Sequence, residues 1–297
     1  MDKNNEKYIE ETPLIVIESN DDNKPSATTV INVGHQHRWR WVAASALAAL
    51  LVVLALVAAL GYWRYYIHLG VPVSVSPEEN IAKLEQPLAG HRPKVVMTSD
   101  SILGVRLNFY KIEGLRAEFM LDEPSPNDKS VYLYAHAADY DTHGTPLGSL
   151  VINGKEKSND QSRLGYFAAV GNHMVIGVSR YEDVKDYAVK HKGHFFRQFI
   201  LVSDGVLPPR FQLHGKVERR ALGRIGDTLY YIEAPNPETM WDFADALREY
   251  GFVDAIYMTG GDAYSYYRDS KGEMHAIGKR HTPHRGATPW LVFKTRK

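Results

Sequence analysis

The chain has 297 residues, and its 35 Lys and Arg residues are balanced by 35 Asp and Glu residues, with no cysteine. Balanced charge argues against a nucleic-acid-binding protein. The lack of cysteine excludes disulfides, thiolate metal sites and a cysteine nucleophile, although it does not assign a compartment.

The N-terminal part predicts a membrane anchor. An uncharged apolar run from Val42 to Gly61 matches the roughly 20 residues that cross a bilayer, and Trp and Tyr residues flank it on both sides. A cleavable signal peptide is the alternative, but the long polar stretch before the run favours a retained helix. We therefore expect a disordered tail over residues 1–37 and a bilayer-spanning anchor over residues 38–66.

Arginines beside this run predict its orientation. Arg38 and Arg40 precede it, whereas Arg64 alone follows it closely. The excess of positive charge on the cytoplasmic side predicts a cytoplasmic N-terminus. The chain is then a single-pass protein of the cytoplasmic membrane whose C-terminal part lies in the periplasm or outside the cell.

Past the anchor, the pattern predicts a stalk and one domain. Ser76 and Pro77 start a short helix that runs to about Leu84, within a stalk over residues 67–93. Residues 94–297 predict one α+β domain, with a single mixed sheet and a few flanking helices. Strand-like runs, rich in branched and aromatic residues, occur at residues 103–112, 115–121, 131–135, 147–152, 165–169, 174–178 and 195–202.

Two helices interrupt the strands. The first covers residues 181–192, with Ser179 and Glu182 as its capping box. The second begins at Asn236 and Pro237 and ends at Gly251, with apolar residues at helical spacing between them.

A glycine turn follows the second helix and the buried strand of residues 252–258. Thr259, Gly260, Gly261 and Asp262 form this turn. Paired glycines let the backbone approach a ligand closely, and the hydroxyl and carboxylate lie beside backbone amides. The alternative is an ordinary hairpin turn between residues 252–258 and 264–268.

A second polar segment follows the strand of residues 131–135. It contains His136, Asp139 and Asp141 among small residues. An imidazole beside carboxylates can act as an acid or a base near neutral pH. The alternative is a loop whose side chains only satisfy turn amides.

Two histidine pairs have the spacing of metal ligands, His191 with His194 and His281 with His284. Neither pair has a carboxylate or a cysteine at a ligand-like interval. We interpret all four as exposed histidines and expect no metal and no cofactor.

Four segments taken together resemble the phosphodiester glycosidase family, the group related to the enzyme that uncovers mannose 6-phosphate. That group includes bacterial membrane-anchored members. The segments are G-T-P-L-G-S-L-V-I-N-G-K at residues 144–155, R-Q-F-I-L-V-S-D-G at 197–205, R-R-A-L-G at 219–223, and F-A-D-A-L-R-E-Y-G-F-V-D-A-I-Y-M-T-G-G at 243–261. The resemblance implies hydrolysis of a sugar joined through its anomeric carbon to phosphate, in a sugar phosphodiester or a related glycoconjugate.

The resemblance also implies roles for particular residues. Arg219 matches the family arginine, His136 stands in place of a family asparagine, and Thr259 in place of a family aspartate. The implied catalytic residues are His136, Asp139, Asp141 and Asp262, and the implied substrate-binding residues are Arg219, Thr259, Gly260 and Gly261. The alternative is a non-catalytic member that binds a polysaccharide or a partner protein.

Overall fold

The computed structural model describes residues 34–63, 77–86, 92–138, 145–209, 211, 214–279 and 289–296, with only the backbone described for residues 34–39. The chain divides into two compact units, Met1–Tyr62 and Trp63–Lys297. We describe each by itself and call the second the body.

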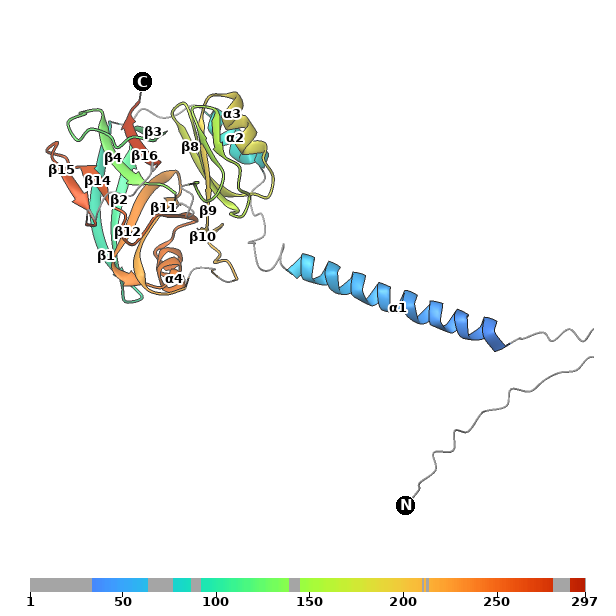
Figure 1. The fold of residues 1–297 in the computed structure, drawn as a ribbon. Helices are drawn as coiled ribbons and strands as arrows, with labels where there is room; N and C mark the ends of the chain where they lie inside the picture. The colour runs from blue at the N-terminus through green and yellow to red at the C-terminus, as the bar shows by residue number, and fades with distance from the viewer. Residues whose placement is uncertain are drawn as a thin grey trace, which may run out of the picture. The chain divides into compact units, whose positions relative to one another are not determined.

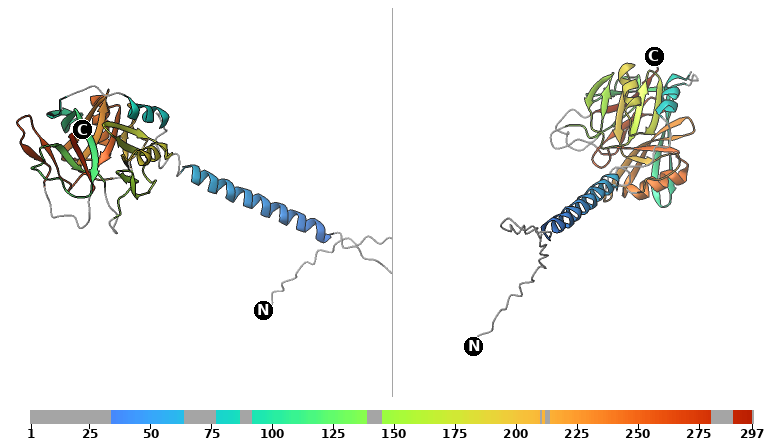
Figure 2. Two further views of the ribbon diagram at one scale, coloured as in Figure 1. Left: turned by 90° about the horizontal axis from the view of Figure 1, so that it is seen from above. Right: turned by 90° about the vertical axis from the view of Figure 1, so that its right-hand side faces the viewer.

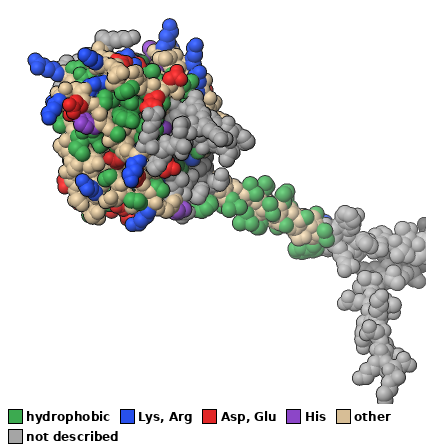
Figure 3. Space-filling view, turned by 60° about the vertical axis from the view of Figure 1, so that its left-hand side comes forward, with side chains coloured by type: hydrophobic (Ala, Val, Ile, Leu, Met, Phe, Trp, Pro, Cys, Tyr) green, Lys and Arg blue, Asp and Glu red, His purple; other side chains and the backbone are tan. Residues whose placement is uncertain are grey.

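The first unit contains helix α1, Gly34–Tyr62. Its segment Arg40–Tyr62 has a mean hydropathy of 2.7 and is long and apolar enough to cross a membrane. Hydrophobic side chains lie along the helix (Figure 3), and the Ser45 hydroxyl donates to the carbonyl of Val42. Length and composition thus confirm a candidate membrane span at the predicted place.

The body is an α+β structure, as predicted, but the described strands form three sheets rather than the single predicted sheet (Figure 1). The six-stranded sheet has the order β1-β2-β12-β11-β13-β10, the β4 sheet β15-β14-β4-β16-β3, and the β7 sheet β6-β5-β9-β7-β8. Every pairing between these strands is antiparallel. The bounds are β1 Lys94–Ile102, β2 Val105–Glu113, β3 Leu115–Met120, β4 Val131–His136, β5 Leu150–Ile152, β6 Lys155–Ser158, β7 Gly165–Val170, β8 His173–Val178, β9 His194–Gln198, β10 Ile200–Val202, β11 Val217–Ile225, β12 Thr228–Glu238, β13 Asp254–Met258, β14 Ser265–Arg268, β15 Met274–Ile277 and β16 Trp290–Thr295.

The main apolar core lies where the three sheets meet. It takes side chains from all three, among them Phe119, Phe167 and Leu222. A second core lies between the other face of the six-stranded sheet and helix α4, Met240–Tyr250, which contributes Phe243 and Leu247. Because both faces of the six-stranded sheet are buried, consecutive residues of its inner strands enter different cores.

A third core lies between the β7 sheet and two helices, α2, Pro77–Glu85, and α3, Asp183–Lys190. Figures 1 and 2 show α2 and α3 side by side on this sheet. Leu84 is 3% exposed in this core, and Asn80 Nδ2 donates to Tyr166 Oη over 2.5 Å. The sequence places α2 in a stalk, but its apolar face is packed into the body.

Several strands and helices begin or end at other residues than the sequence predicts. The predicted strand at residues 195–202 is two strands, β9 and β10, which belong to different sheets. Strand β12 extends through Asn236 and Pro237, so α4 starts later, with Thr239 as its N-cap accepting from the amide of Asp242. The predicted end of α4 is confirmed, because Gly251 has φ +107°.

The predicted cap of α3 is wrong in detail. Glu182 is the N-cap residue of α3, but its side chain makes no capping hydrogen bond. Its carboxylate instead pairs with Lys185 over 2.5 Å and with the buried Arg197 over 2.9 Å. Glu182 therefore neutralises the buried Arg197 guanidinium instead of capping α3, because a buried charge without a partner costs more than a missing cap.

Candidate functional site

The glycine turn connects two sheets. Strand β13 before it belongs to the six-stranded sheet and β14 after it to the β4 sheet, so the hairpin alternative is wrong. A Cβ atom at Gly260 would lie 2.3 Å from the carbonyl oxygen of Glu218, which only glycine permits. The turn therefore lies against the first residues of β11.

Backbone amides of this turn are already bonded within the protein. The amide of Gly260 donates to Tyr257 Oη over 3.2 Å, and that of Gly261 donates to the Glu218 carbonyl over 2.9 Å. Asp262 is exposed. Thr259 Oγ1 is buried and makes no hydrogen bond to any described residue, so the hydroxyl rather than the amides has unused bonding capacity.

Two neighbouring arginines of β11 point to opposite faces of the six-stranded sheet, because successive strand side chains alternate. Arg219 lies on the α4 side, where its Nε donates to the Glu238 carbonyl over 3.0 Å and Nη2 donates to the Gly215 carbonyl over 2.8 Å. Its guanidinium carbon lies 6.0 Å from the centroid of the Tyr257 ring. Arg219 is 2% exposed, and these hydrogen bonds go to backbone carbonyls of the protein itself.

Arg220 lies on the other face and reaches the glycine turn. It is fully buried, and its Nη1 donates to the Gly261 carbonyl over 3.3 Å. Its Nη2 lies 3.1 Å from Glu218 Oε2 and 3.6 Å from Glu233 Oε1. Arg220 Nε has no hydrogen-bond partner among the described residues. One buried guanidinium thus joins two carboxylates to the glycine turn.

The two carboxylates of this cluster have different surroundings. Glu233, on β12 opposite Arg220, is buried, and Asn108 Nδ2 donates to its Oε2 over 3.1 Å. Burial raises the pKa of Glu233, although Asn108 and Arg220 both favour its ionised form. The Glu218 side chain is 31% exposed. We name Arg220, Glu218 and Glu233 the arginine cluster.

Two tyrosines accompany the arginine cluster. Tyr231 Oη lies 2.7 Å from Ser265 Oγ, which links the six-stranded sheet to the first residue of β14. Burial raises the pKa values of Tyr110 and Tyr231, so both hydroxyls remain protonated at neutral pH. Gly278 lies beside Arg220, where φ +75° favours glycine and a Cβ atom would lie 2.4 Å from Arg220 Nη2.

His136 lies on a different face from the arginine cluster. Its β4 neighbour Ala135 pairs with Ser265 and faces the main core. His136 faces the other side, 3% exposed, with its ring centroid 4.0 Å from Trp290 and 4.9 Å from Tyr264. The glycine turn and the end of β4 are adjacent through the β14 pairing, but the imidazole and Arg220 lie on opposite faces of the β4 sheet.

The other predicted polar residues fall in three groups. Asp139 and Asp141 lie outside the described residues, as do His281 and His284. His191 is exposed as expected. His194 is not exposed but buried, and its Nδ1 accepts from the Phe119 amide over 3.1 Å.

One group of side chains in the described part of the chain has the spacing of metal ligands, Asp269, Glu273 and His275. Asp269 Oδ1 accepts from the amides of Lys271 and Glu273, and Oδ2 lies 2.9 Å from His275 Nε2. These bonds hold the turn between β14 and β15, which accounts for the group without an ion.

Sequence reasoning missed Arg220, Glu218 and Glu233. A signal for Glu233 is present, because it is the one charged residue in the run Tyr230-Tyr231-Ile232-Glu233-Ala234. An acidic residue in an otherwise apolar strand must find a buried partner. Arg220 on the neighbouring strand is the partner, and the sequence alone could not identify it because the pairing of β11 with β12 brings the two residues together.

Comparison with known proteins gives distant similarities in structure. No family model and no curated protein matches the sequence. The zebrafish N-acetylglucosamine-1-phosphodiester alpha-N-acetylglucosaminidase catalytic domain, auto-inhibited by its pro-peptide, has 13% identity and a TM-score of 0.47, over 69% of this chain and 83% of its own. A hypothetical protein from Synechocystis has 9% identity and a TM-score of 0.46, over 68% and 62%. A putative exported protein from Burkholderia pseudomallei has 12% identity and a TM-score of 0.26, over 69% and 58%. These values describe a distant likeness in fold and carry no information on substrate or activity.

Proposed function

We propose that the chain is a membrane-anchored envelope hydrolase of glycosyl phosphodiester or related glycoconjugate bonds. The arginine cluster carries this proposal. A guanidinium that holds two carboxylates, one buried and one partly exposed, combines an oxyanion-binding group with an acid–base pair. The resemblance of the motifs to the phosphodiester glycosidases supports the proposal, because it implies a sugar phosphodiester site at the same turn and strand.

The reaction assigns a role to each member of the cluster. As the bond between the anomeric carbon and the phosphate oxygen breaks, its electron pair leaves with the phosphate, whose growing charge Arg220 stabilises. Water attacks the anomeric carbon and gives a proton to Glu218. Glu233, whose pKa is raised by burial, gives a proton to the departing phosphate. The products are a free sugar and a phosphate monoester.

Residues of the glycine turn and of the segment that follows β4 complete the proposed site. In this proposal Thr259 Oγ1 donates to the phosphate and Asp262 accepts from a sugar hydroxyl. In this proposal Arg220 takes the phosphate role that the resemblance gives to Arg219, because Arg220 Nε has no hydrogen-bond partner among the described residues, whereas Arg219 Nε donates to the Glu238 carbonyl. Asp139 and Asp141 stay as predicted contributors, whereas His136, whose ring lies on the opposite face of the β4 sheet from Arg220, contacts no substrate in this proposal.

Hydrolysis of sugar 1-phosphodiesters by the full chain in detergent tests the proposal. Release of free sugar is measured for the parent and for Glu233→Gln, Glu218→Gln and Arg220→Lys. Loss of one acid–base group lowers turnover by about 10²- to 10⁴-fold. Glu118→Gln is the matched control, since Glu118 pairs with Arg116 and Lys294 outside the cluster, and it keeps full turnover. Equal turnover in Glu233→Gln and the parent contradicts the assignment.

One observation favours the alternative, a catalytically degenerate member that binds a polysaccharide or a partner protein. The family motif would offer a substrate the hydrogen-bond donors of Arg219, Gly260 and Gly261. In this structure those donors form hydrogen bonds within the protein instead. If no phosphodiester is cleaved by the parent or by Thr259→Asp, while an immobilised envelope polysaccharide retains the full chain, the binding function is the better one.

A further inference from the structure

A cleft of about 530 Å³ lies around the turn between β11 and β12. This is the opposite end of β11 from the glycine turn, so the cleft is separate from the arginine cluster. Its walls come from α2, from the turn between β7 and β8, from the turn between β2 and β3, and from the residue after β16. A volume of this size suits a small-molecule ligand.

Positive charge predominates in the cleft. Four cations line it, Lys83, Lys111, Arg224 and Arg296, against two carboxylates, Glu113 and Asp227. Lys111 pairs with Glu113 over 2.7 Å and Arg224 with Asp254 over 2.5 Å. Lys83 has no ion pair or hydrogen bond to a described residue. An ammonium group facing a cleft with excess positive charge favours an anionic ligand.

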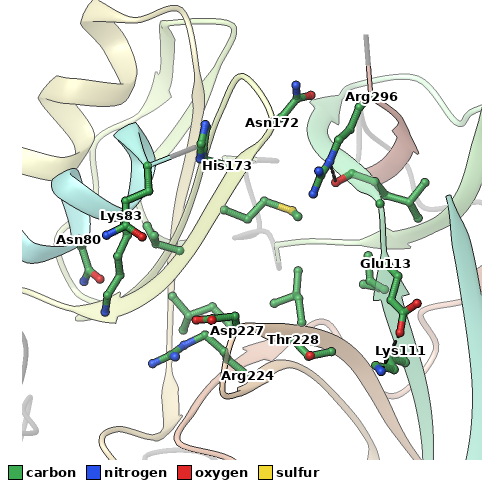
Figure 4. Close-up of a pocket in the computed structure, with 18 residues that line it drawn as sticks. Asn80, Lys83, Lys111, Glu113, Asn172, His173, Arg224, Asp227, Thr228 and Arg296 are labelled. Atoms are coloured by element: carbon green, nitrogen blue, oxygen red, sulfur yellow. Dashed lines mark hydrogen bonds and ion pairs between the residues drawn. The ribbon is translucent and has the colours of Figure 1, made fainter. Parts of the chain in front are cut away.

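Further polar groups, among them the Asp227 carboxylate, lie between these cations. Figure 4 shows Lys83 and Asn80 on one side of the cleft, Arg296 across it, His173 and Asn172 along one edge, and Asp227 and Thr228 along the other. His173 Nδ1 is buried and has no hydrogen-bond partner among the described residues. Burial and the charge of Arg296 lower the pKa of His173, so its ring is neutral at pH 7.

We propose that this cleft binds an organic oxyanion of sugar size that carries a phosphate or a carboxylate group. Lys83 and Arg296 bind the anionic group from opposite sides. Asp227, Thr228 and Asn172 can accept from and donate to the hydroxyl groups of the neutral part, and His173 Nδ1 gains the partner that it lacks. Binding here is independent of hydrolysis at the arginine cluster.

Calorimetric titration of the full chain in detergent, at low ionic strength, tests this proposal with three probes. Glucose 6-phosphate and glucuronate present the two kinds of anion, and glucose presents the same ring without charge. We expect at least one anion to bind and glucose to bind at least about tenfold more weakly. The anion that binds more tightly shows whether the cleft prefers a phosphate or a carboxylate group. Raising the salt concentration weakens anion binding, because dissolved ions screen the charges that line an open cleft.

Variants separate this cleft from the arginine cluster. Lys83→Gln weakens anion binding at least about fivefold, because it removes the unpaired cation. Lys129→Gln is the matched control, since Lys129 is exposed and lies outside the cleft, and it leaves the affinity unchanged. His173→Phe keeps the ring shape and weakens binding by removing the nitrogens. The proposal is overturned if neither anion binds, if glucose binds as tightly as the anions, or if Lys83→Gln and His173→Phe both keep the parental affinity.

Discussion

Arg220 holds the inner polar contacts of the six-stranded sheet together. Replacing it removes the shared donor of Glu218, Glu233 and the Gly261 carbonyl, and breaking such a buried pair costs about 3 to 5 kcal/mol. We expect Arg220→Met to lower the free energy of unfolding in urea by about this amount, and the double variant Arg220→Met with Glu233→Met to recover much of the loss. Arg248→Met is the control, because its pair with Asp245 is on the surface of α4, and it changes stability by less than about 1 kcal/mol. A double variant no more stable than Arg220→Met alone would contradict this account.

His194 predicts a pH dependence of stability. Burial lowers its pKa to about 4 from the ordinary value near 6.5. Between these values the unfolded chain binds a proton that the folded chain does not, so stability falls as the pH falls from 6.5 to 4 and is unaffected above 6.5. The expected loss is about 3 kcal/mol.

Urea unfolding measured at several pH values checks this. His194→Asn keeps an acceptor for the Phe119 amide and should flatten the slope between pH 6.5 and 4. His191→Asn, three residues away on the surface, should keep the parental slope. The same slope in all three proteins would mean that another group carries the pH dependence.

At the scale of elements, α2 belongs to the body. Leu84 is packed in the third core, and complete burial of a leucine stabilises a fold by about 2 to 5 kcal/mol relative to alanine. A fragment that begins at residue 72 should therefore unfold cooperatively, with a higher melting temperature than a fragment that begins at residue 92. Leu84→Ala in the longer fragment should lower the melting temperature, whereas Lys83→Ala, on the exposed side of α2, should not. Equal melting temperatures of the two fragments would show that α2 contributes nothing.

At the scale of the whole molecule, the arginines beside α1 predict a cytoplasmic N-terminus and a body outside the cytoplasm. The chain has no cysteine, so single cysteines report sidedness without background. In intact spheroplasts, a membrane-impermeant maleimide should label Lys129→Cys, and it should label Ser26→Cys only after permeabilisation. Labelling of Ser26→Cys alone in intact spheroplasts would reverse the orientation.

Features that depend on local pattern could be predicted from the amino-acid sequence. The apolar run of α1, the C-terminal stop of α4 at Gly251 and the approximate places of β2, β3, β4, β7 and β8 follow from hydrophobic periodicity and glycine conformation, which are properties of neighbouring residues. Strand β1 was not predicted, because Thr98, Ser99, Asp100 and Ser101 interrupt its apolar pattern. As an edge strand with exposed side chains, it forms through its pairing with β2.

Which residues share a site, in contrast, depends on how distant segments pack in the folded chain. The motif R-R-A-L-G names two arginines, but the choice between them depends on which face of β11 meets the β4 sheet. The partner of Glu233 depends on strand order, and the packing of α2 depends on contacts about 100 residues apart in the chain, such as that of Tyr187 Oη with Glu85. A local pattern encodes an element and its buried face, whereas the neighbour that covers this face is fixed only when distant segments pack together.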